Sequence, residues 1–304
     1  MKKSQVWAVA MDFTKMDSSV FEYTRFLSSL LHPKKIYFMH VIKEMDSFPH
    51  LSDEFLAGFE HQQIVEKKLE QEYKIDQYFK DSGISYECHI MTGLPMDEVI
   101  NLVVRKSVDL VIVGRKKVSG GAGIVSDRLS RNLSCNFLMV PEGYKPKLNN
   151  ILVTTDFSEH SRIALGKAIE IKGRNEEIRL MTHHSYGVPV GYSKSGKSYE
   201  EFVAIMKLNA EKEMDQLLET FDSEIKPIIT HRTEVSLDDQ ILEVAKSNDV
   251  DMIVIGSRGQ SRASFDLLGS NTMKLLKSNE GIPLLIVKKE GENQNIVDAI
   301  KGTH

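Results

Sequence analysis

Residues 256–270 read GSRGQSRASFDLLGS and directly follow the apolar run VDMIVI at 250–255. A run this apolar predicts a buried strand, and a segment with three glycines and several hydroxyl residues cannot continue it. Glycine adopts positive φ angles without strain and allows the backbone to approach another group closely. The segment is therefore either a tight turn or a loop whose backbone N–H groups lie against a negatively charged ligand.

The apolar run before this loop has an earlier copy, because VDLVIVG at 108–114 recurs as VDMIVIG at 250–256. The match extends upstream without a gap, from His89 opposite His231 to Asp97 opposite Asp239. Two further pairs follow the same order: VAMDF at 9–13 with VTTDF at 153–157, and FLMV at 137–140 with LLIV at 284–287. Three anchors in one order at a near-constant spacing predict a duplicated domain.

The boundary between the two copies falls in PEGYKPKLNN at 141–150, a polar stretch with two prolines that is typical of a short linker. We expect a first domain at 1–146, a second at 147–290 and a C-terminal tail at 291–304. A chain of 304 residues has room for two domains of this size.

Each half alternates short apolar runs with longer helical segments, which predicts the α/β class with a parallel sheet covered on both faces. Right-handed crossovers then give two doubly wound domains, each a five-stranded parallel sheet in the order 3-2-1-4-5 flanked by helices. In such sheets the ligand lies at the carboxyl ends of the strands, where the strand order reverses. The expected strands of the second half are NILVTT, IRLMTH, IKPIIT, VDMIVIG and PLLIV.

Several polar residues of the second half follow strands at this expected binding edge. The first strand ends in TTDFS with Asp156, and the second ends in THHSYG with His183 and His184. The fourth ends in the glycine loop, whose pattern is G-x2-G-x9-G-S and which precedes the helical segment NTMKLLKS. A helix N-terminus offers free N–H groups and a partial positive charge, so this arrangement suits phosphate binding. The pattern is neither a P-loop nor G-x-G-x-x-G.

The glycine pattern, the aspartate closing the first strand and the duplication together resemble a tandem universal stress protein over nearly the whole chain. The resemblance implies that ATP or a related adenine nucleotide binds the second domain, with Mg²⁺ accompanying the phosphates. It also implies that the loop holds phosphates and ribose, that the aspartate lies beside the nucleoside, and that the end of the second strand meets the adenine. The expected nucleotide-binding residues are Thr154, Thr155, Asp156, His183, His184, Gly256, Ser257, Arg258, Gly259, Gly269, Ser270, Asn271 and Thr272.

The first half departs from this pattern, since its loop is four residues shorter when Gly123 is aligned with Gly269. Lys117 then replaces the second glycine and Ile124 replaces the serine, so we expect nucleotide binding to be lost there. Asp12, which matches Asp156, is expected to cap the following helix, since aspartate is a favoured N-cap residue. For Asp156, capping and ligand contact stay equally open.

Composition narrows the class of protein. A net charge of −4 and a pI of about 6.2 do not favour a nucleic-acid partner. The apolar runs are too short to span a membrane, and the N-terminus lacks the features of a signal peptide, so a cytoplasmic protein is expected. Cys88 and Cys135 lack metal-ligand spacing and are interpreted as free thiols. Adjacent histidines on a strand point to opposite faces, so no metal site is expected at His183 and His184.

These observations favour a cytoplasmic stress-response protein that binds an adenine nucleotide in its second domain and acts as a sensor or regulator. No catalytic constellation is evident from the spacing. Two alternatives stay open: a slow ATPase or nucleotidyl-transfer enzyme, and a nucleotide-free module for protein contacts. We expect the two domains to pair as an intrachain pseudo-dimer through NFLMV and PLLIV, while homodimerisation and a regulatory protein partner stay open.

Overall fold

The computed structural model describes residues 5–42, 53–116, 123–259, 268–279 and 281–291. Backbone contacts divide the chain into two compact units, and the boundary along the sequence lies between Pro146 and Lys147. The first unit alternates strands and helices in the order β1 (Val6–Ala10), α1 (Met16–Leu31), β2 (Lys35–Ile42), α2 (Asp53–Phe79), β3 (Ser85–Thr92), α3 (Pro95–Arg105), β4 (Leu110–Arg115), α4 (Gly123–Asn132) and β5 (Asn136–Pro141).

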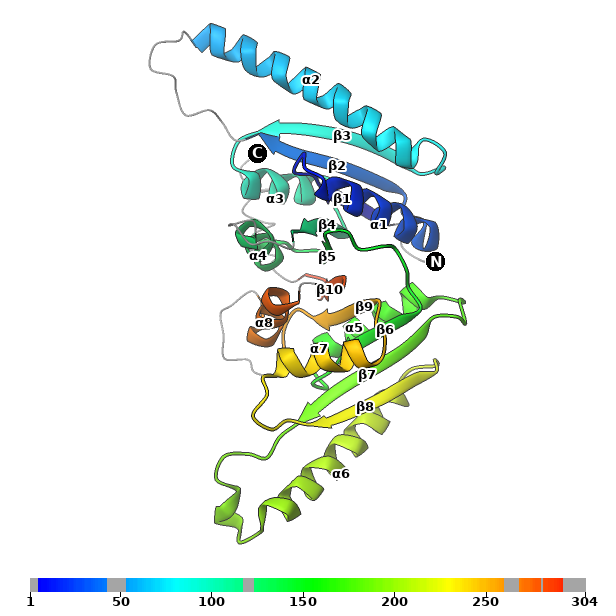
Figure 1. Ribbon diagram of the computed structural model, residues 1–304, viewed down its shortest axis with the longest axis vertical. Coiled ribbons are helices and arrows are strands. Elements are labelled where there is room, and N and C mark those ends of the chain that lie inside the picture. Colours follow the sequence, from blue (N-terminus) through cyan, green and yellow to red (C-terminus); the bar gives the residue numbers. More distant parts are fainter. Residues whose placement is uncertain (1–4, 43–52, 117–122, 260–267, 280, 292–304) are drawn as a thin grey trace. The chain divides into compact units, whose positions relative to one another are not determined.

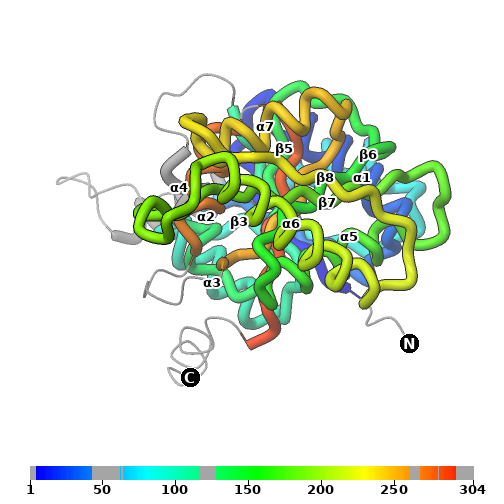
Figure 2. The backbone as a smooth tube through the Cα atoms, turned by 90° about the horizontal axis from the view of Figure 1, so that it is seen from below, coloured from blue at the N-terminus to red at the C-terminus, as the bar shows by residue number. Residues whose placement is uncertain are grey.

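The second unit, Lys147–Lys289, repeats this alternation and adds one short 3₁₀ helix, η1. The chain can be followed through both units in Figures 1 and 2. The elements are β6 (Asn150–Thr154), α5 (Glu159–Lys172), β7 (Arg179–Tyr186), η1 (Tyr192–Ser195), α6 (Tyr199–Leu218), β8 (Ile225–His231), α7 (Leu237–Ser247), β9 (Met252–Gly256), α8 (Ser270–Ser278) and β10 (Leu284–Val287).

Each unit contains five parallel strands with its first strand in the middle. The order is β3-β2-β1-β4-β5 in the first unit and β8-β7-β6-β9-β10 in the second. Helices α1 and α2 pack together, as do α3 with α4 and α7 with α8. The expected doubly wound α/β fold in the order 3-2-1-4-5 is confirmed. The pairing of the two units through NFLMV and PLLIV stays a prediction.

The repeated Val-Asp pair has a structural role at the start of the fourth strand in each unit. In the first unit, the Asp109 carboxylate accepts a hydrogen bond from the Val6 amide at 2.8 Å. In the second unit, the Asp251 carboxylate accepts from the amides of Asn149 at 2.7 Å and Asn150 at 3.1 Å. Both aspartates therefore tie the amino end of the fourth strand to that of the first, and this contact explains why the pair occurs in both repeats.

The strand ladder corrects one part of the sequence alignment between the repeats. Ile42 lies opposite Thr92, whereas Tyr186, at the same place in the second unit, lies opposite His231. His231 therefore occupies the place of Thr92 and not that of His89, as the ungapped match predicted. Two residues separate β3 from α3, but five separate β8 from α7, so the difference in connection length absorbs the shift.

The core of each unit consists of strands that are buried on both faces. Every residue of β6, β9 and β10 is buried, as expected for central parallel strands. In the first unit, Trp7 is fully buried and Phe38 packs edge-on against Phe21 and Phe79. Cys88 and Cys135 are free thiols, and both are buried. Among the helices that the structure describes, none is both long and apolar enough to cross a membrane.

Replacing Asp251 by alanine is expected to destabilise the second unit by about 2 kcal/mol, because the buried Asn150 amide loses its charged acceptor. The variant Asp251→Asn keeps one acceptor oxygen and should lose less. Urea denaturation followed by far-UV circular dichroism measures both free energies of unfolding. Equal stability of the wild type and Asp251→Ala would show that this contact does not hold the strands together.

Candidate functional site

The turn after β6 places the Asp156 side chain at the carboxyl edge of the sheet. The Thr155 amide donates to the His183 carbonyl at 2.8 Å, and the Phe157 amide donates to the Thr155 hydroxyl at 3.0 Å. Phe157 takes a φ of 63°, an uncommon value for a non-glycine residue. The Ser158 amide donates to Asp156 Oδ1 at 3.1 Å. These bonds hold the carboxylate at the start of α5 in a conformation that the turn dictates.

Asp156 is not the N-cap of α5. That position belongs to Ser158, whose hydroxyl accepts a hydrogen bond from the Ser161 amide at 3.3 Å. Of the two roles left open for Asp156, helix capping is thus excluded in the strict sense, while ligand contact stays a prediction.

Two glycines of the loop approach other groups closely, one of them a backbone carbonyl and the other a side chain. A Cβ atom on Gly256 would lie 2.8 Å from the His160 carbonyl carbon and oxygen, so no larger residue fits without backbone movement. A Cβ atom on Gly259 would lie 2.6 Å from Asp156 Oδ2. Gly259 therefore lies directly beside the aspartate, and the loop after β9 meets the turn after β6. The sheet thus joins the two segments that the sequence predicted to flank the crevice.

Some of the expected binding residues are buried, and their polar groups bond other parts of the protein. Ser257 is fully buried, and Thr272 is 3% exposed with its hydroxyl donating to the Gly256 carbonyl at 2.9 Å. The Gly269 amide donates to the Ser257 carbonyl at 2.8 Å. Thr272, expected to offer its hydroxyl to a ligand, instead fastens α8 to the end of β9. Thr154 and Thr155 are also buried.

The residues that line the open side of the site are Asp156, Arg258, Gly259, Ser270 and Asn271, all of them partly or fully exposed. Ser270 and Asn271 open α8, whose first-turn amides have no partner within the helix. Helices α5, α6 and α7 carry acidic residues in their first turns, whereas α8 carries none. The N-terminus of α8 therefore keeps the positive electrostatic character that favours an anion.

The two histidines have different environments because they point to opposite faces of β7. His184 Nδ1 bonds the Thr155 carbonyl at 2.9 Å, and its ring packs on Phe157 at 4.3 Å between centroids. His183 is 2% exposed and bonds the Thr230 hydroxyl at 2.8 Å. Burial lowers the pKa of His183 to about 4. The His183 side chain therefore lies inside the fold, and of the two side chains only that of His184 supports the turn beside Asp156.

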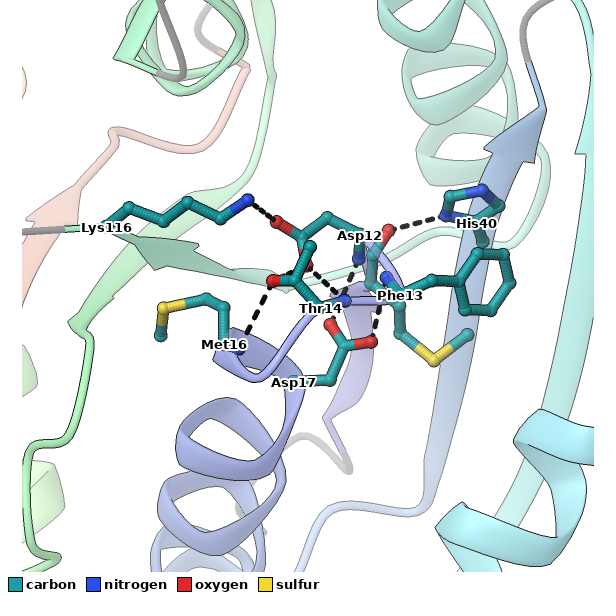
Figure 3. Close-up of polar contacts among 8 residues, drawn as sticks. Asp12, Phe13, Thr14, Met16, Asp17, His40 and Lys116 are labelled. Carbon is teal, nitrogen blue, oxygen red and sulfur yellow. Dashed lines mark hydrogen bonds and ion pairs between the residues drawn. The ribbon is translucent and has the colours of Figure 1, made fainter. Parts of the chain in front are cut away.

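The first unit has the same turn, as Figure 3 shows. Phe13 takes a φ of 59°, and His40 Nδ1 bonds the Met11 carbonyl at 2.8 Å, which matches Phe157 and His184. The centroids of the Phe13 and His40 rings lie 3.6 Å apart. The scaffold of the crevice is therefore common to both repeats, and the differences between them lie in the side chains around it.

Asp12 is held differently from Asp156. Its carboxylate pairs with the Lys116 ammonium at 2.9 Å and accepts from both the amide and the hydroxyl of Thr14. Although burial opposes the shift, these hydrogen bonds keep the pKa of Asp12 below its usual value. The N-cap of α1 is Lys15, so the expectation that Asp12 caps the helix is wrong. The carboxylate instead accepts hydrogen bonds within the turn and forms the ion pair with Lys116.

Asp17 is a further acidic residue at this site, and sequence reasoning did not single it out. It is 6% exposed, and it accepts hydrogen bonds from the amides of Asp12 and Phe13, each at 3.0 Å. Burial raises the pKa of Asp17 to about 6. The corresponding residue of the second repeat is Ser161. This difference between the repeats was the sequence signal that could have drawn attention to Asp17. Lys117 and the side chain of Ile124 lie outside the described residues.

The fold and the site define a doubly wound α/β protein in which the N-terminus of α8, without acidic residues in its first turn, lies at the strand-order switch. A sequence model of the universal stress protein family matches residues 8–141 and again residues 147–288. The chain therefore belongs to the universal stress protein family and carries two of its domains in tandem. A curated relative, universal stress protein MJ0577 of Methanocaldococcus jannaschii, is 27% identical over 154 residues, which are 46% of this chain and 94% of that protein.

Solved structures agree with the fold along nearly the whole chain. A universal stress protein from Archaeoglobus fulgidus superposes with a TM-score of 0.67 at 17% identity, covering 94% of this chain and 97% of that one. The protein PA1789 of Pseudomonas aeruginosa, described as functionally unknown, gives 0.64 at 14% identity, covering 98% and 97%. At these identities, both likenesses concern the fold alone.

The buried carboxyl of Asp17 predicts a pH-dependent contribution to the stability of the first unit. The folded protein keeps this proton up to about pH 6, whereas the ordinary pKa of an aspartate in an unfolded chain is 3.8. Between these values only the folded state binds the proton, so raising the pH lowers the free energy of unfolding, by up to about 3 kcal/mol. Trp7, the single tryptophan, reports this unfolding by fluorescence.

The neutral variants Asp17→Ser and Asp17→Asn serve as matched controls for this prediction. The stability of the wild type relative to each variant should fall as the pH rises from 4 to 7, and by a similar amount for both. A difference that is constant over this range would contradict the assignment, whatever its absolute size.

Proposed function

We propose that the second unit binds ATP or a related adenine nucleotide at the carboxyl edge of β6 and β9, and that the protein acts as a nucleotide-dependent sensor or regulator in the stress response. The observation that carries the proposal is the convergence of the Asp156 carboxylate, Gly259 and the N-terminus of α8. These groups come from segments far apart in sequence, and their chemistry suits the different parts of a nucleotide.

The phosphates are assigned to the N-terminus of α8. Ser270 and Asn271 contribute exposed amides, Ser270 adds a hydroxyl donor, and no acidic residue in the first turn repels an anion. Arg258, half-buried between Gly256 and Gly259, adds a positive charge beside the same loop. Mg²⁺ would accompany the phosphates, bound chiefly by water and phosphate oxygens, as is usual for this ion.

The nucleoside is assigned to Asp156 and the end of β7. A carboxylate is an acceptor for hydroxyl donors, so Asp156 suits a ribose and disfavours direct contact with a phosphate. His184 holds the Thr155 carbonyl and packs on Phe157, so the turn that carries Asp156 is rigid before a ligand arrives. Because the groups gathered here are partners for phosphates and hydroxyls, binding is favoured over turnover.

The first unit is proposed to bind no nucleotide in this manner. The Lys116 ammonium pairs with the Asp12 carboxylate, the counterpart of Asp156, and thereby competes with a ribose for that acceptor. We therefore expect one nucleotide per chain.

Calorimetric titration of ATP, AMP, GTP and cAMP into the wild type tests the proposal. The fourth compound is included because one universal stress protein has been solved in complex with it. We expect ATP to bind with a stoichiometry of one. The variant Gly259→Asp with Ser270→Ala places a second carboxylate beside Asp156 and removes a donor, so it should weaken binding at least tenfold, or about 1.4 kcal/mol.

Gly281→Ala provides the matched glycine control, because an added Cβ there meets nothing within 4 Å. This control should bind ATP like the wild type. Failure of the wild type to bind any of the four compounds at millimolar concentration would overturn the proposal. Phosphate release by the wild type above the level of the Gly259→Asp, Ser270→Ala variant would instead support the ATPase alternative.

A further inference from the structure

Strand β3 is an edge strand of the sheet in the first unit. Within the described chain it pairs with β2 alone, over eight residues from Ser85 to Thr92. Figure 1 shows α2 running alongside this strand. A long edge strand without protection is a template for another extended chain, and proteins usually block such edges with proline, lysine or bulges. The sequence of β3, SYECHIMT, contains neither proline nor lysine.

The backbone groups that face away from the sheet follow from the strand alternation. The Gly93 amide donates to the Ile42 carbonyl of β2 at 3.1 Å, so Gly93 faces inward. Since main-chain direction alternates along a strand, the odd-numbered residues of β3 face β2 as well. Tyr86, Cys88 and Ile90 therefore present their N–H and C=O groups at the outer edge.

The corresponding edge of the second unit is blocked. The Arg232 amide donates to the Tyr186 carbonyl at 2.7 Å, so by the same alternation the odd-numbered residues of β8 face outward. One of these is Pro227, which has no N–H to donate. Phe38 lies opposite Cys88, and its counterpart Thr182 lies opposite Pro227. Pro227 thus occupies in the second repeat the position that Cys88 occupies in the first.

The free edge of β3 also borders a groove. A cavity of about 410 Å³ lies between β3 and α2, and it is lined by Lys68, Glu72, Ile75, Asp76, Tyr86, Glu87, Cys88 and His89. Four consecutive residues of the strand contribute to it, as expected when the opening lies along the edge and not over one face. The groove therefore combines outward backbone groups on one side with a helix on the other.

The lining of the groove indicates the chemistry of its occupant. The lining contains three carboxylates and one lysine. Lys68 pairs with Glu72 and Lys35 pairs with Glu87, while Asp76 accepts a hydrogen bond from the Tyr86 hydroxyl. The lining therefore keeps an excess of negative charge, which favours a basic segment.

Beside the groove, α2 exposes an apolar stripe at helical spacing, with Val65 at 42%, Leu69 at 63% and Tyr73 at 69% exposure. Lys67, on the opposite side of α2, lies over the Phe13 ring, so the stripe faces away from that contact.

We propose that the β3 edge binds an extended segment of a partner protein, which adds as a further strand along the outer edge of β3, beside α2. Main-chain hydrogen bonds to Tyr86, Cys88 and Ile90 supply affinity, and side-chain contacts supply specificity. The segment alternates basic side chains, which meet Glu72 and Asp76, with apolar side chains, which meet the stripe on α2. This site is separate from the nucleotide crevice and does not depend on it.

The test uses fluorescently labelled peptides of eight residues, the length of β3. One alternates valine with lysine, and the other alternates valine with glutamate. Fluorescence anisotropy should show binding of the lysine peptide to the full wild-type chain and at least tenfold weaker binding to Cys88→Pro. The substitution copies the block at Pro227. It removes an outward-facing N–H and the thiol and fixes the φ angle, but it removes no N–H that faces β2. Glu72→Lys should also weaken binding, without altering the strand.

Cys88→Ala controls for the loss of the thiol and should bind like the wild type, while Trp7 fluorescence verifies that each variant is folded. Absence of binding to the wild type, or equal binding to Cys88→Pro, overturns the proposal. Equal binding of the glutamate peptide overturns the assigned charge. Sedimentation provides the remaining comparison: a wild-type dimer that Cys88→Pro converts to a monomer would identify a second copy of this chain as the occupant, and not a partner protein.

Discussion

The site depends on one constraint, namely that the first and fourth strands of each unit lie side by side in a parallel sheet. Parallel neighbours end at the same edge, so the loops that leave them must meet there. Asp109 and Asp251 fix this pairing at the opposite end, by accepting amides from the start of the first strand. The register that results places Gly259 beside Asp156, although about a hundred residues separate them in sequence.

Much of this arrangement could be predicted from the sequence because it depends on signals that are local or repeated. Apolar runs bounded by turns identified the strands, and alternation with helices identified the parallel class and its strand order. The glycine loop identified the edge of the sheet that carries the site. Gly256 and Gly259 fit that interpretation for a physical reason, since each has another group within 3 Å of where a side chain would begin.

The remainder depended on tertiary contacts that have no local signal. Thr272 faces inward because its hydroxyl bonds the end of β9. Asp12 does not cap α1 because the turn that it shares with Asp156 places the start of the helix further along the chain. The register of β8 against β7 differs from the one that the ungapped alignment predicted. It depends on the pairing with β7, and the longer connection after β8 compensates for the shift. Asp17 was not predicted as a site residue because the sequence does not distinguish a buried aspartate on a helix from an exposed one.

The same corrections show how the two repeats have diverged in opposite directions at two separate places. At the crevice, the Asp12 carboxylate of the first unit pairs with Lys116, and the Asp156 carboxylate of the second lies beside Gly259. At the sheet edge the order is reversed, because the first unit has Cys88 where the second has Pro227. Under the two proposals, an ion pair and a proline would each remove a binding capacity that the shared scaffold otherwise offers. A duplicated chain would then keep two functions apart by blocking a different site in each copy.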